Sequence, residues 1–282
     1  MGNTVLITGG TGGMGLATAK IMGRDHNVVL ADLSQERIDA AIAELSSLGI
    51  AARGRICDIT DLGSVQDLFD FAGNDPANRL RAVVHTAGVS PQMGDAAFIY
   101  RVNAMGTVNI ARTFLPLAGE GDALVNVASI AGHMTPSVML PVRTFALVDT
   151  DLPKFEYKLN ASSKIIPEKA RPGAAYSTSK AFVLWYTRHI AGAFGAKGAR
   201  VVSVSPGTFD TEMGRLEEKS GSGKLIEYSA IKRYGRPEEV AEVLAFCAST
   251  APGYLTGTDI LVDGGTKAGL GLKGMLDMAR SQ

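Results

Sequence analysis

The chain has 282 residues, of which 46% are apolar and 20% charged, so it is long and apolar enough to bury a large core. Lysine plus arginine equals aspartate plus glutamate at 28 each, which leaves no bulk positive field to attract nucleic acid. Its two cysteines and four scattered histidines favour a reducing compartment and argue against a metal site.

Short β-rich apolar runs alternate with helical stretches along the chain. The first predicted strand, residues 4–7, ends too soon for a secretory signal or a membrane span, which predicts a cytoplasmic protein with no membrane partner. A helix over 14–22 and a strand over 27–32 follow, and Ser34 caps the next helix. Further strands are expected at 55–58, 80–85, 123–128, 200–205 and 260–262, with a helix at about 62–71.

Apolar strands separated by helices imply a parallel sheet that is covered on both faces, because each parallel connection needs a crossover. No composition break divides the chain, so we expect an α/β fold in which residues 1–282 form a single doubly wound Rossmann domain with a mostly seven-stranded sheet. Residues 133–173 interrupt the pattern with five prolines. Such length inside a compact domain indicates an inserted segment, here placed just before a helix that contains Tyr176.

A glycine-rich stretch, T-G-G-T-G-G-M-G from Thr8 to Gly15, follows the first strand. It fits the general dinucleotide fingerprint and two stricter variants of it at once, so it does not choose between them. The loop leads into the start of a helix, where free backbone N–H groups and the helix dipole favour a pyrophosphate. The absent side chains let the backbone approach such a ligand closely.

Asp32 ends the second strand, 17 residues after Gly15. A carboxylate there can accept both ribose hydroxyls of an adenosine and would repel a 2′-phosphate. No arginine or lysine stands at the next two positions, Leu33 and Ser34, to pair such a phosphate. The sequence therefore predicts NAD(H) rather than NADP(H) as the cofactor.

Tyr176 and Lys180 lie four residues apart and so on the same face of the predicted helix. Hydride transfer to or from a nicotinamide must be matched by a proton at the substrate oxygen. A free tyrosine, with a pKa of about 10, is a poor base at neutral pH, and a cation one helical turn away lowers that value. Ser129, after the fifth strand, can hydrogen-bond the substrate oxygen.

Taken together in this order, the motifs resemble those of the short-chain dehydrogenase/reductase family over nearly the whole chain. The resemblance implies four catalytic residues, namely Asn103, Ser129, Tyr176 and Lys180, with Lys180 also gripping the nicotinamide ribose and Asn103 holding a water that relays the proton. It also implies a set of cofactor-binding residues, which are Gly9, Thr11, Gly12, Gly13, Met14, Gly15, Asp32, Leu33, Asp58, Ile59, Thr86, Ala87, Gly88, Tyr176, Lys180, Pro206, Gly207, Thr208, Phe209 and Thr211. The closing motifs at Gly235 and at 262–265 resemble those of the family too.

The chain departs from the family where Ser129 and Tyr176 are 47 positions apart, much farther than is typical. A long insertion there is similar to that of the branch containing bacterial 3α-hydroxysteroid dehydrogenase/carbonyl reductases. The segment is expected either to roof the substrate pocket or to cover the helix face that relatives use for pairing subunits. Our hypothesis is that it shapes a roomy apolar pocket, with residues 213–228 as a second wall.

The resemblance thus implies an NAD(H)-dependent oxidoreductase that interconverts a secondary alcohol and a ketone, hydroxysteroid-like or another apolar carbonyl compound. Relatives are commonly homodimers or homotetramers, and the same is expected here. One alternative is an epimerase or dehydratase of the extended family acting on nucleotide sugars, which would share the tyrosine–lysine pair. Another is a non-catalytic NAD-sensing regulator, although such proteins usually lose the tyrosine or the lysine.

Overall fold

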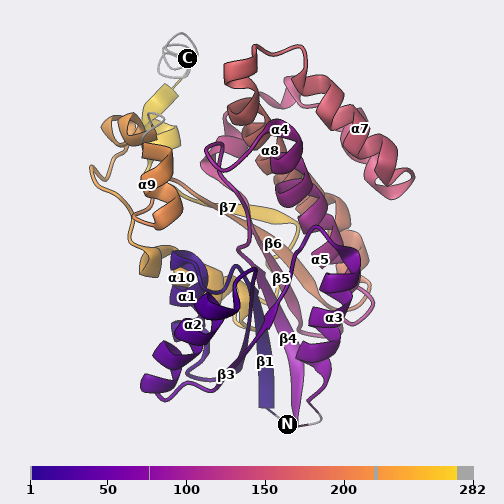
Figure 1. The fold of residues 1–282 in the computed structure, drawn as a ribbon, viewed down its shortest axis with the longest axis vertical. Coiled ribbons are helices and arrows are strands. Elements are labelled where there is room, and N and C mark those ends of the chain that lie inside the picture. The colour runs from indigo at the N-terminus through magenta and orange to yellow at the C-terminus, as the bar shows by residue number, and fades with distance from the viewer. Residues whose placement is uncertain (1, 76, 219–221, 272–282) are drawn as a thin grey trace.

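A single seven-stranded sheet, in which every strand pairing is parallel, forms the centre of the computed structural model, which describes residues 2–75, 77–218 and 222–271 (Figure 1). The spatial order is β3-β2-β1-β4-β5-β6-β7. The strands are β1 (Gly2–Thr8), β2 (Asn27–Asp32), β3 (Ala52–Ile56), β4 (Asn78–His85), β5 (Ala123–Val127), β6 (Arg200–Pro206) and β7 (Thr258–Val262). The predicted α/β fold with a seven-stranded parallel sheet is confirmed.

Helices cover both faces of this sheet. The longer ones are α1 (Gly13–Met22), α2 (Gln35–Ser47), α3 (Leu62–Gly73), α5 (Gly106–Phe114), α7 (Leu152–Ser163), α8 (Arg171–Gly195) and α10 (Pro237–Ala248). A short helix α4 (Ala96–Tyr100) runs into α5 through a turn of π-helix, η1 (Arg101–Met105). The remaining short elements are η2 (Ile130–His133), η3 (Ser137–Met139), α6 (Val142–Phe145), η4 (Ala146–Asp149), η5 (Glu168–Ala170), α9 (Glu212–Glu218) and η6 (Ser222–Tyr228).

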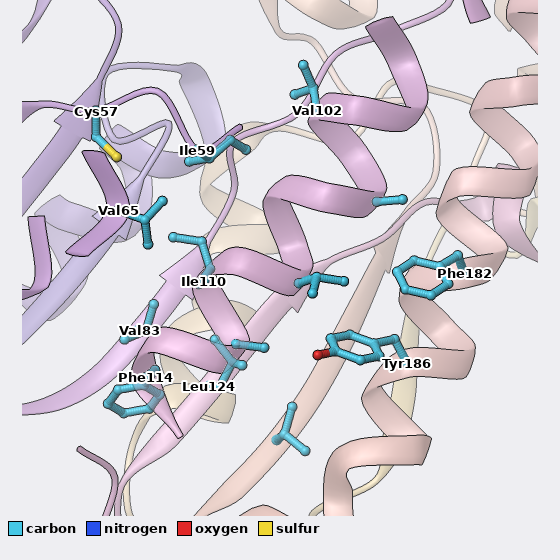
Figure 2. Packing of buried hydrophobic residues seen from close by; sticks show 14 of the residues in the cluster. Cys57, Ile59, Val65, Val83, Val102, Ile110, Phe114, Leu124, Phe182 and Tyr186 are labelled. Atoms are coloured by element: carbon cyan, nitrogen blue, oxygen red, sulfur yellow. The ribbon is translucent and has the colours of Figure 1, made fainter. Parts of the chain in front are cut away.

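Successive side chains along each strand point to opposite faces of the sheet, so the buried side chains form two cores. Val5 and Ile7 point to the face covered by α1, α2 and α10, whereas Leu6 between them joins the core under α3, α5 and α8. Figure 2 shows the rings of Phe182 and Tyr186, on α8, pointing toward α5 within the second core. Because both faces are buried, apolar residues dominate the buried stretches of the central strands, and the polar residues there, such as Asn126 and Ser203, are themselves buried.

The third strand lies three residues earlier than predicted at its start, at Ala52–Ile56 instead of 55–58. It is the edge strand of the sheet and is largely polar, so no apolar run marks its beginning. Gly54 allows α2 to pack closely there, because a Cβ at this glycine would lie 2.2 Å from Cγ2 of Ile38. The backbone ladder continues one bond past the strand, from the Cys57 N–H to the Asp32 carbonyl at 2.9 Å.

Within residues 133–173, the helices α6 and α7 pack against α8, and α7 also packs against α4. The fully buried rings of Phe145 and Phe155 lie 5.3 and 4.9 Å from the ring of Phe182, measured between centroids. Figure 1 shows α7 beside α4 and α8, with α9 on the other side of the carboxyl edge of the sheet. Among the described residues, no helix combines the length and apolar character needed to cross a bilayer.

Candidate active site

A cavity of about 480 Å³ opens at the carboxyl ends of the strands, around the point where the strand order reverses between β1 and β4. In doubly wound sheets this crevice is where ligands bind. Its lining combines the glycine loop with the residues that end the strands and with part of α8 and α9. The strand order of the sheet therefore determines where the cavity lies.

The glycine loop is built so that its backbone can come close to a ligand. Gly9 has a φ of +65°, and a Cβ on Gly15 would lie 2.3 Å from the Gly9 carbonyl oxygen. By contrast, the nearest protein atom to a Cβ on Gly12 is 3.4 Å away, and this glycine lines the cavity. Packing therefore requires Gly9 and Gly15, whereas the open side of Gly12 provides space for a phosphate at the start of α1.

Asp32 is held in a fixed orientation at the end of β2. Its Oδ2 accepts a hydrogen bond from the Thr11 hydroxyl at 2.5 Å, and its Oδ1 accepts one from the Leu33 N–H at 2.8 Å. Arg37, at the start of α2, also lines the cavity, and its guanidinium lies 3.7 Å from a carboxylate oxygen of Glu212 on α9. At this end of the cavity the Asp32 carboxylate is thus fixed in position, and the nearby Arg37 guanidinium faces the Glu212 carboxylate.

Ser129, Tyr176 and Lys180 line the same cavity as the glycine loop, although 47 residues separate the first two. Ser129 precedes η2, and its Oγ accepts the Ala131 N–H at 3.1 Å, so its hydroxyl hydrogen can point elsewhere. The Lys180 ammonium lies 5.8 Å from the centroid of the Tyr176 ring and donates to the Val127 carbonyl at 3.1 Å. Lys180 is only 6% exposed, so little water screens its charge from the tyrosine.

Asn103 lies behind the cavity wall, and its side chain is not part of the lining. Its amide accepts from the Val89 N–H at 2.9 Å and donates to the Val89 carbonyl at 3.0 Å and to Ser179 Oγ at 3.2 Å. A Cβ on Gly88 would lie 3.1 Å from Asn103 Oδ1 and 3.3 Å from the Lys180 ammonium. Asn103 therefore fixes the loop after β4 against α8, while its predicted role in holding a water stays a prediction.

His85 ends β4 in a fully buried position directly behind this wall. Its ring nitrogens face two threonine hydroxyls, Thr8 at 2.7 Å and Thr107 at 3.3 Å. Burial, and secondarily the charge of Lys180, lower the pKa of His85 from 6.5 to about 3. The imidazole is therefore neutral at ordinary pH and acts as a hydrogen-bonding bridge.

Most of the predicted cofactor-binding positions line the cavity. Thr11 and Thr208 are the two that do not, and Thr11 acts instead through its bond to Asp32. Lining residues that the sequence did not predict include Arg37, Cys57, Met93, Phe98, Val102 and Glu212. Burial raises the pKa of the Cys57 thiol to about 11, so it is protonated at neutral pH. These positions belong to no glycine or tyrosine motif, and only their closeness in sequence to Asp32, Asn103 and Thr211 could have suggested them.

The inserted segment does not shape this cavity, contrary to one of the two roles expected for it. Among the described residues, none of those lining the cavity falls within 133–173. The expected second wall is present in part, since Met213, Gly214 and Leu216 line the cavity, while residues 219–221 of that wall lie outside the described ones. The segment is held to α8 and α4 instead, by its buried rings and by the hydroxyl of Tyr100, which bonds to Ser162 and Thr178. Phe145, Val148, Phe155 and Leu159 of the segment are buried in the core beside α8, whereas Val138, Met139 and Ile165 are exposed.

Comparison with known proteins identifies the family. Residues 3–141 match the family model described as short chain dehydrogenase, and residues 159–267 match the one described as enoyl-(acyl carrier protein) reductase. The "short-chain dehydrogenase/reductase bsc3" of Alternaria brassicicola is 30% identical over 275 residues, which span 95% of this chain and 97% of the relative. The chain belongs to the short-chain dehydrogenase/reductase family. A "7alpha-hydroxysteroid dehydrogenase" of Bacteroides fragilis is 29% identical, with 93% of each chain covered.

The fold is that of solved short-chain dehydrogenases. A structure of such a protein from Burkholderia cenocepacia, in complex with NADP, superposes with a TM-score of 0.74 at 24% identity and covers 95% of this chain and 98% of that one. The chain is thus an oxidoreductase of the short-chain dehydrogenase/reductase family, which binds a nicotinamide dinucleotide. The glycine cradle and the Asp32 carboxylate fit such a cofactor. The relatives described above are named as dehydrogenases or reductases, so the epimerase and the NAD-sensing regulator gain no support from them.

Proposed function

We propose that this chain is an NAD(H)-dependent oxidoreductase that interconverts a secondary alcohol and a ketone, with Tyr176 as the acid/base. One observation carries the proposal. Ser129, Tyr176 and Lys180 line the cavity that the glycine loop also lines, so a proton donor and a hydrogen-bond donor lie within the same space as a cofactor. When bound, the nicotinamide supplies the hydride for reduction or accepts it in oxidation.

The protein's own residues account for the proton and the oxygen. In the direction of reduction, the Tyr176 hydroxyl gives its proton to the ketone oxygen, and in oxidation the phenolate takes it back. Ser129 donates its hydroxyl hydrogen to the same oxygen, since its Oγ already accepts the Ala131 N–H. The buried ammonium of Lys180 favours the phenolate form of Tyr176.

We propose an apolar, uncharged substrate, hydroxysteroid-like or another bulky ketone. The large side chains that line the cavity outside the predicted cofactor positions include Val89, Met93, Phe98, Met213 and Leu216. Three of them are flexible methionine or leucine side chains on loops or on α9, which suits a hydrophobic ligand of variable shape. The Bacteroides fragilis relative is named for a steroid, which accords with this substrate class.

Tyr176→Phe is the decisive variant. Loss of general acid/base catalysis lowers turnover by a factor of about 10² to 10⁴. We expect at least a hundredfold fall in ketone-dependent NADH oxidation, followed at 340 nm with cyclohexanone, acetophenone and a steroid ketone. The dissociation constant of NADH should stay within about twofold, because the phenyl ring keeps its packing. Tyr157→Phe, an exposed tyrosine of α7, is the matched control and should keep parent activity. Activity of Tyr176→Phe within about tenfold of the parent would remove Tyr176 from the mechanism.

NAD(H) is proposed over NADP(H) because the Asp32 carboxylate is held by two hydrogen bonds where an adenosine ribose would lie. Arg37, the nearby cation that lines the cavity, already faces Glu212. In Asp32→Ala, the preference for NADH over NADPH, measured as a ratio of kcat/KM, should fall at least about tenfold, which corresponds to about 1.4 kcal/mol. Asp39→Ala removes an equal charge from an exposed site on α2 and should leave the ratio unchanged. An unchanged ratio in Asp32→Ala would reject NAD(H) selectivity by this residue.

The remaining assignments stay proposals of the same kind. We propose that residues 1–282 form a single domain, that the protein is cytoplasmic, and that it assembles as a homodimer or homotetramer. The segment 133–173 covers the outer side of α8, so pairing would use another surface. Light scattering on the eluting protein measures this state directly, and a monomer would reject the proposed assembly.

A further inference from the structure

A second polar cluster lies near the active site but outside its cavity. It joins His133, the last residue of η2, to Asp259 on β7 and to two serines of β6, Ser203 and Ser205. Lys267, close to the end of the described chain, completes it. None of these five residues lines the cavity, so they cannot touch a substrate there.

The Asp259 carboxylate is the centre of the cluster. Its side chain is 3% exposed, and its Oδ1 accepts hydrogen bonds from Ser203 Oγ at 2.6 Å and Ser205 Oγ at 2.9 Å. Its Oδ2 lies 2.8 Å from Nε2 of His133. A buried carboxylate is stable only when it is well supplied with donors, and this one has three.

The charges around His133 fix its tautomer. Its Nδ1 lies 3.3 Å from the ammonium of Lys267, which can only donate, so Nδ1 must accept. The ring proton therefore sits on Nε2, where it points to Asp259 and to Ser205 Oγ at 3.1 Å. The imidazole thus ties η2 to β7 by a directed hydrogen bond.

The short helix η2 connects this tie to the catalytic residues. Ser129 caps its start and His133 ends it, only four residues later. Gly132 is pressed against α8, since a Cβ there would lie 2.8 Å from the backbone carbon of Lys180 and 2.9 Å from the nitrogen of Ala181. The turn is therefore wedged between the helix that carries Lys180 and the strand that carries Asp259.

We propose that His133 and Asp259 are positioning residues, which clamp η2 to β7 so that the Ser129 hydroxyl keeps its orientation toward the substrate oxygen. This inference rests on the proposed function, because it assumes that Ser129 acts in the reaction. The hydrogen bond that the clamp maintains is the one from the Ala131 N–H to Ser129 Oγ, since Ala131 lies in η2 and Ser129 caps its start. A misplacement of about 1 Å at a reacting group costs about a hundredfold in rate.

The test uses three substitutions at one position in the full chain. His133→Gln keeps a donor at the distance of Nε2, His133→Asn places its donor too close to the backbone to reach Asp259, and His133→Leu removes it. We expect kcat for the best ketone of the panel to fall about 10- to 100-fold in the Leu and Asn variants and to return to within about threefold of the parent in the Gln variant. The substrate KM and the dissociation constant of NADH should change less than about twofold in all three.

A double-mutant cycle with Ser129→Ala separates positioning from general damage. If the clamp acts through Ser129, Ser129→Ala/His133→Asn has the kcat of Ser129→Ala alone, so the losses are not additive. In the protein without ketone, hydrogen exchange of the peptide spanning 129–133 should be faster in the Asn variant than in the Gln variant.

The outcomes that overturn the proposal are equally specific. A kcat of His133→Asn within threefold of the parent rejects it, as do additive losses in the cycle. Equal losses of kcat in His133→Gln and His133→Asn reject it as well. This comparison does not need His133→Leu, so it still decides the matter if that variant does not fold. If Ser129→Ala itself keeps parent activity, the proposed function has failed in its assignment of Ser129, and this is seen before any His133 variant is compared.

Discussion

The two sides of α8 are held by different kinds of interaction. On the side toward the cavity, buried polar groups meet through directed hydrogen bonds, as in the contacts of Asn103 with Ser179 and of Lys180 with the Val127 carbonyl. On the outer side, rings pack on rings, with Phe145 and Phe155 against Phe182. Hydrogen bonds fix the position of a reacting atom to within a few tenths of an ångström, whereas ring packing supplies free energy with little dependence on orientation. One helix thus has a side that sets geometry and a side that supplies stability.

Phe155→Ala tests this division with the largest effect expected on stability. Removing a fully buried phenylalanine costs about 3–5 kcal/mol. The free energy of unfolding in urea should fall by that amount, while the dissociation constant of NADH stays within about twofold. Tyr157→Ala, on the exposed side of the same helix, should cost less than about 0.5 kcal/mol. If Phe155→Ala weakens NADH binding strongly while the protein is still folded, the two sides of α8 are not separable.

On the cavity side, His85 makes the free energy of unfolding depend on pH. Its pKa is about 3 in the folded chain, against about 6.5 when unfolded, so below pH 6.5 only the unfolded state takes up the proton. This contribution to stability is complete above pH 6.5 and is lost as the pH falls toward 3, with a slope of up to about 1.4 kcal/mol per pH unit. Urea unfolding between pH 6.5 and 4.5 should show that slope in the parent and a smaller one in His85→Asn. Equal slopes in the two proteins would show that His85 titrates alike in both states.

Asp149→Asn has the smallest expected effect. Asp149, in the inserted segment, lies 2.6 Å from Nε2 of His189 on α8, with the aspartate side chain 51% exposed. Exposed polar pairs of this kind contribute about 0–1 kcal/mol, so we expect a loss of stability below about 1 kcal/mol in urea unfolding. A loss of several kcal/mol would mean that the outer side of α8 depends on directed polar contacts as well.

The sequence predicted the cavity side of α8 far better than the outer side. Glycines, Asp32, Tyr176 and Lys180 are needed for their chemistry at set places along the chain, so their spacing can be read without a structure. The packing of Phe145 and Phe155 leaves no such signal. Apart from the helix α7, the segment 133–173 consists of short helical turns without a sustained apolar period, and burial of a ring does not identify its partner. Of its apolar residues, Phe145 and Phe155 are buried whereas Val138 and Met139 are exposed, and the sequence did not show whether the buried ones pack on the pocket or on α8.

Two further differences have equally local reasons. The third strand was predicted too late because it is a polar edge strand, in which alternation is not enforced by burial on both faces. Arg37 and Met93 were not predicted at the cavity because their positions depend on how α2 and the loop after β4 fold back, which no local pattern records. The tie between His133 and Asp259 joins residues 126 positions apart and follows only from the pairing of β6 with β7.

The π-helical turn at Arg101–Met105 limits where residues can be inserted into or deleted from this chain. Each residue of a helix advances the next side chain by about 100°, so a one-residue deletion in this turn would rotate α5 about its axis relative to α4. Asn103 would then leave the backbone of Val89, and the Phe114 ring would swing away from its neighbours Phe69 and Phe194. Exposed loops of the chain can gain or lose residues at little cost, but here the number of residues sets which side chains of α5 reach their partners.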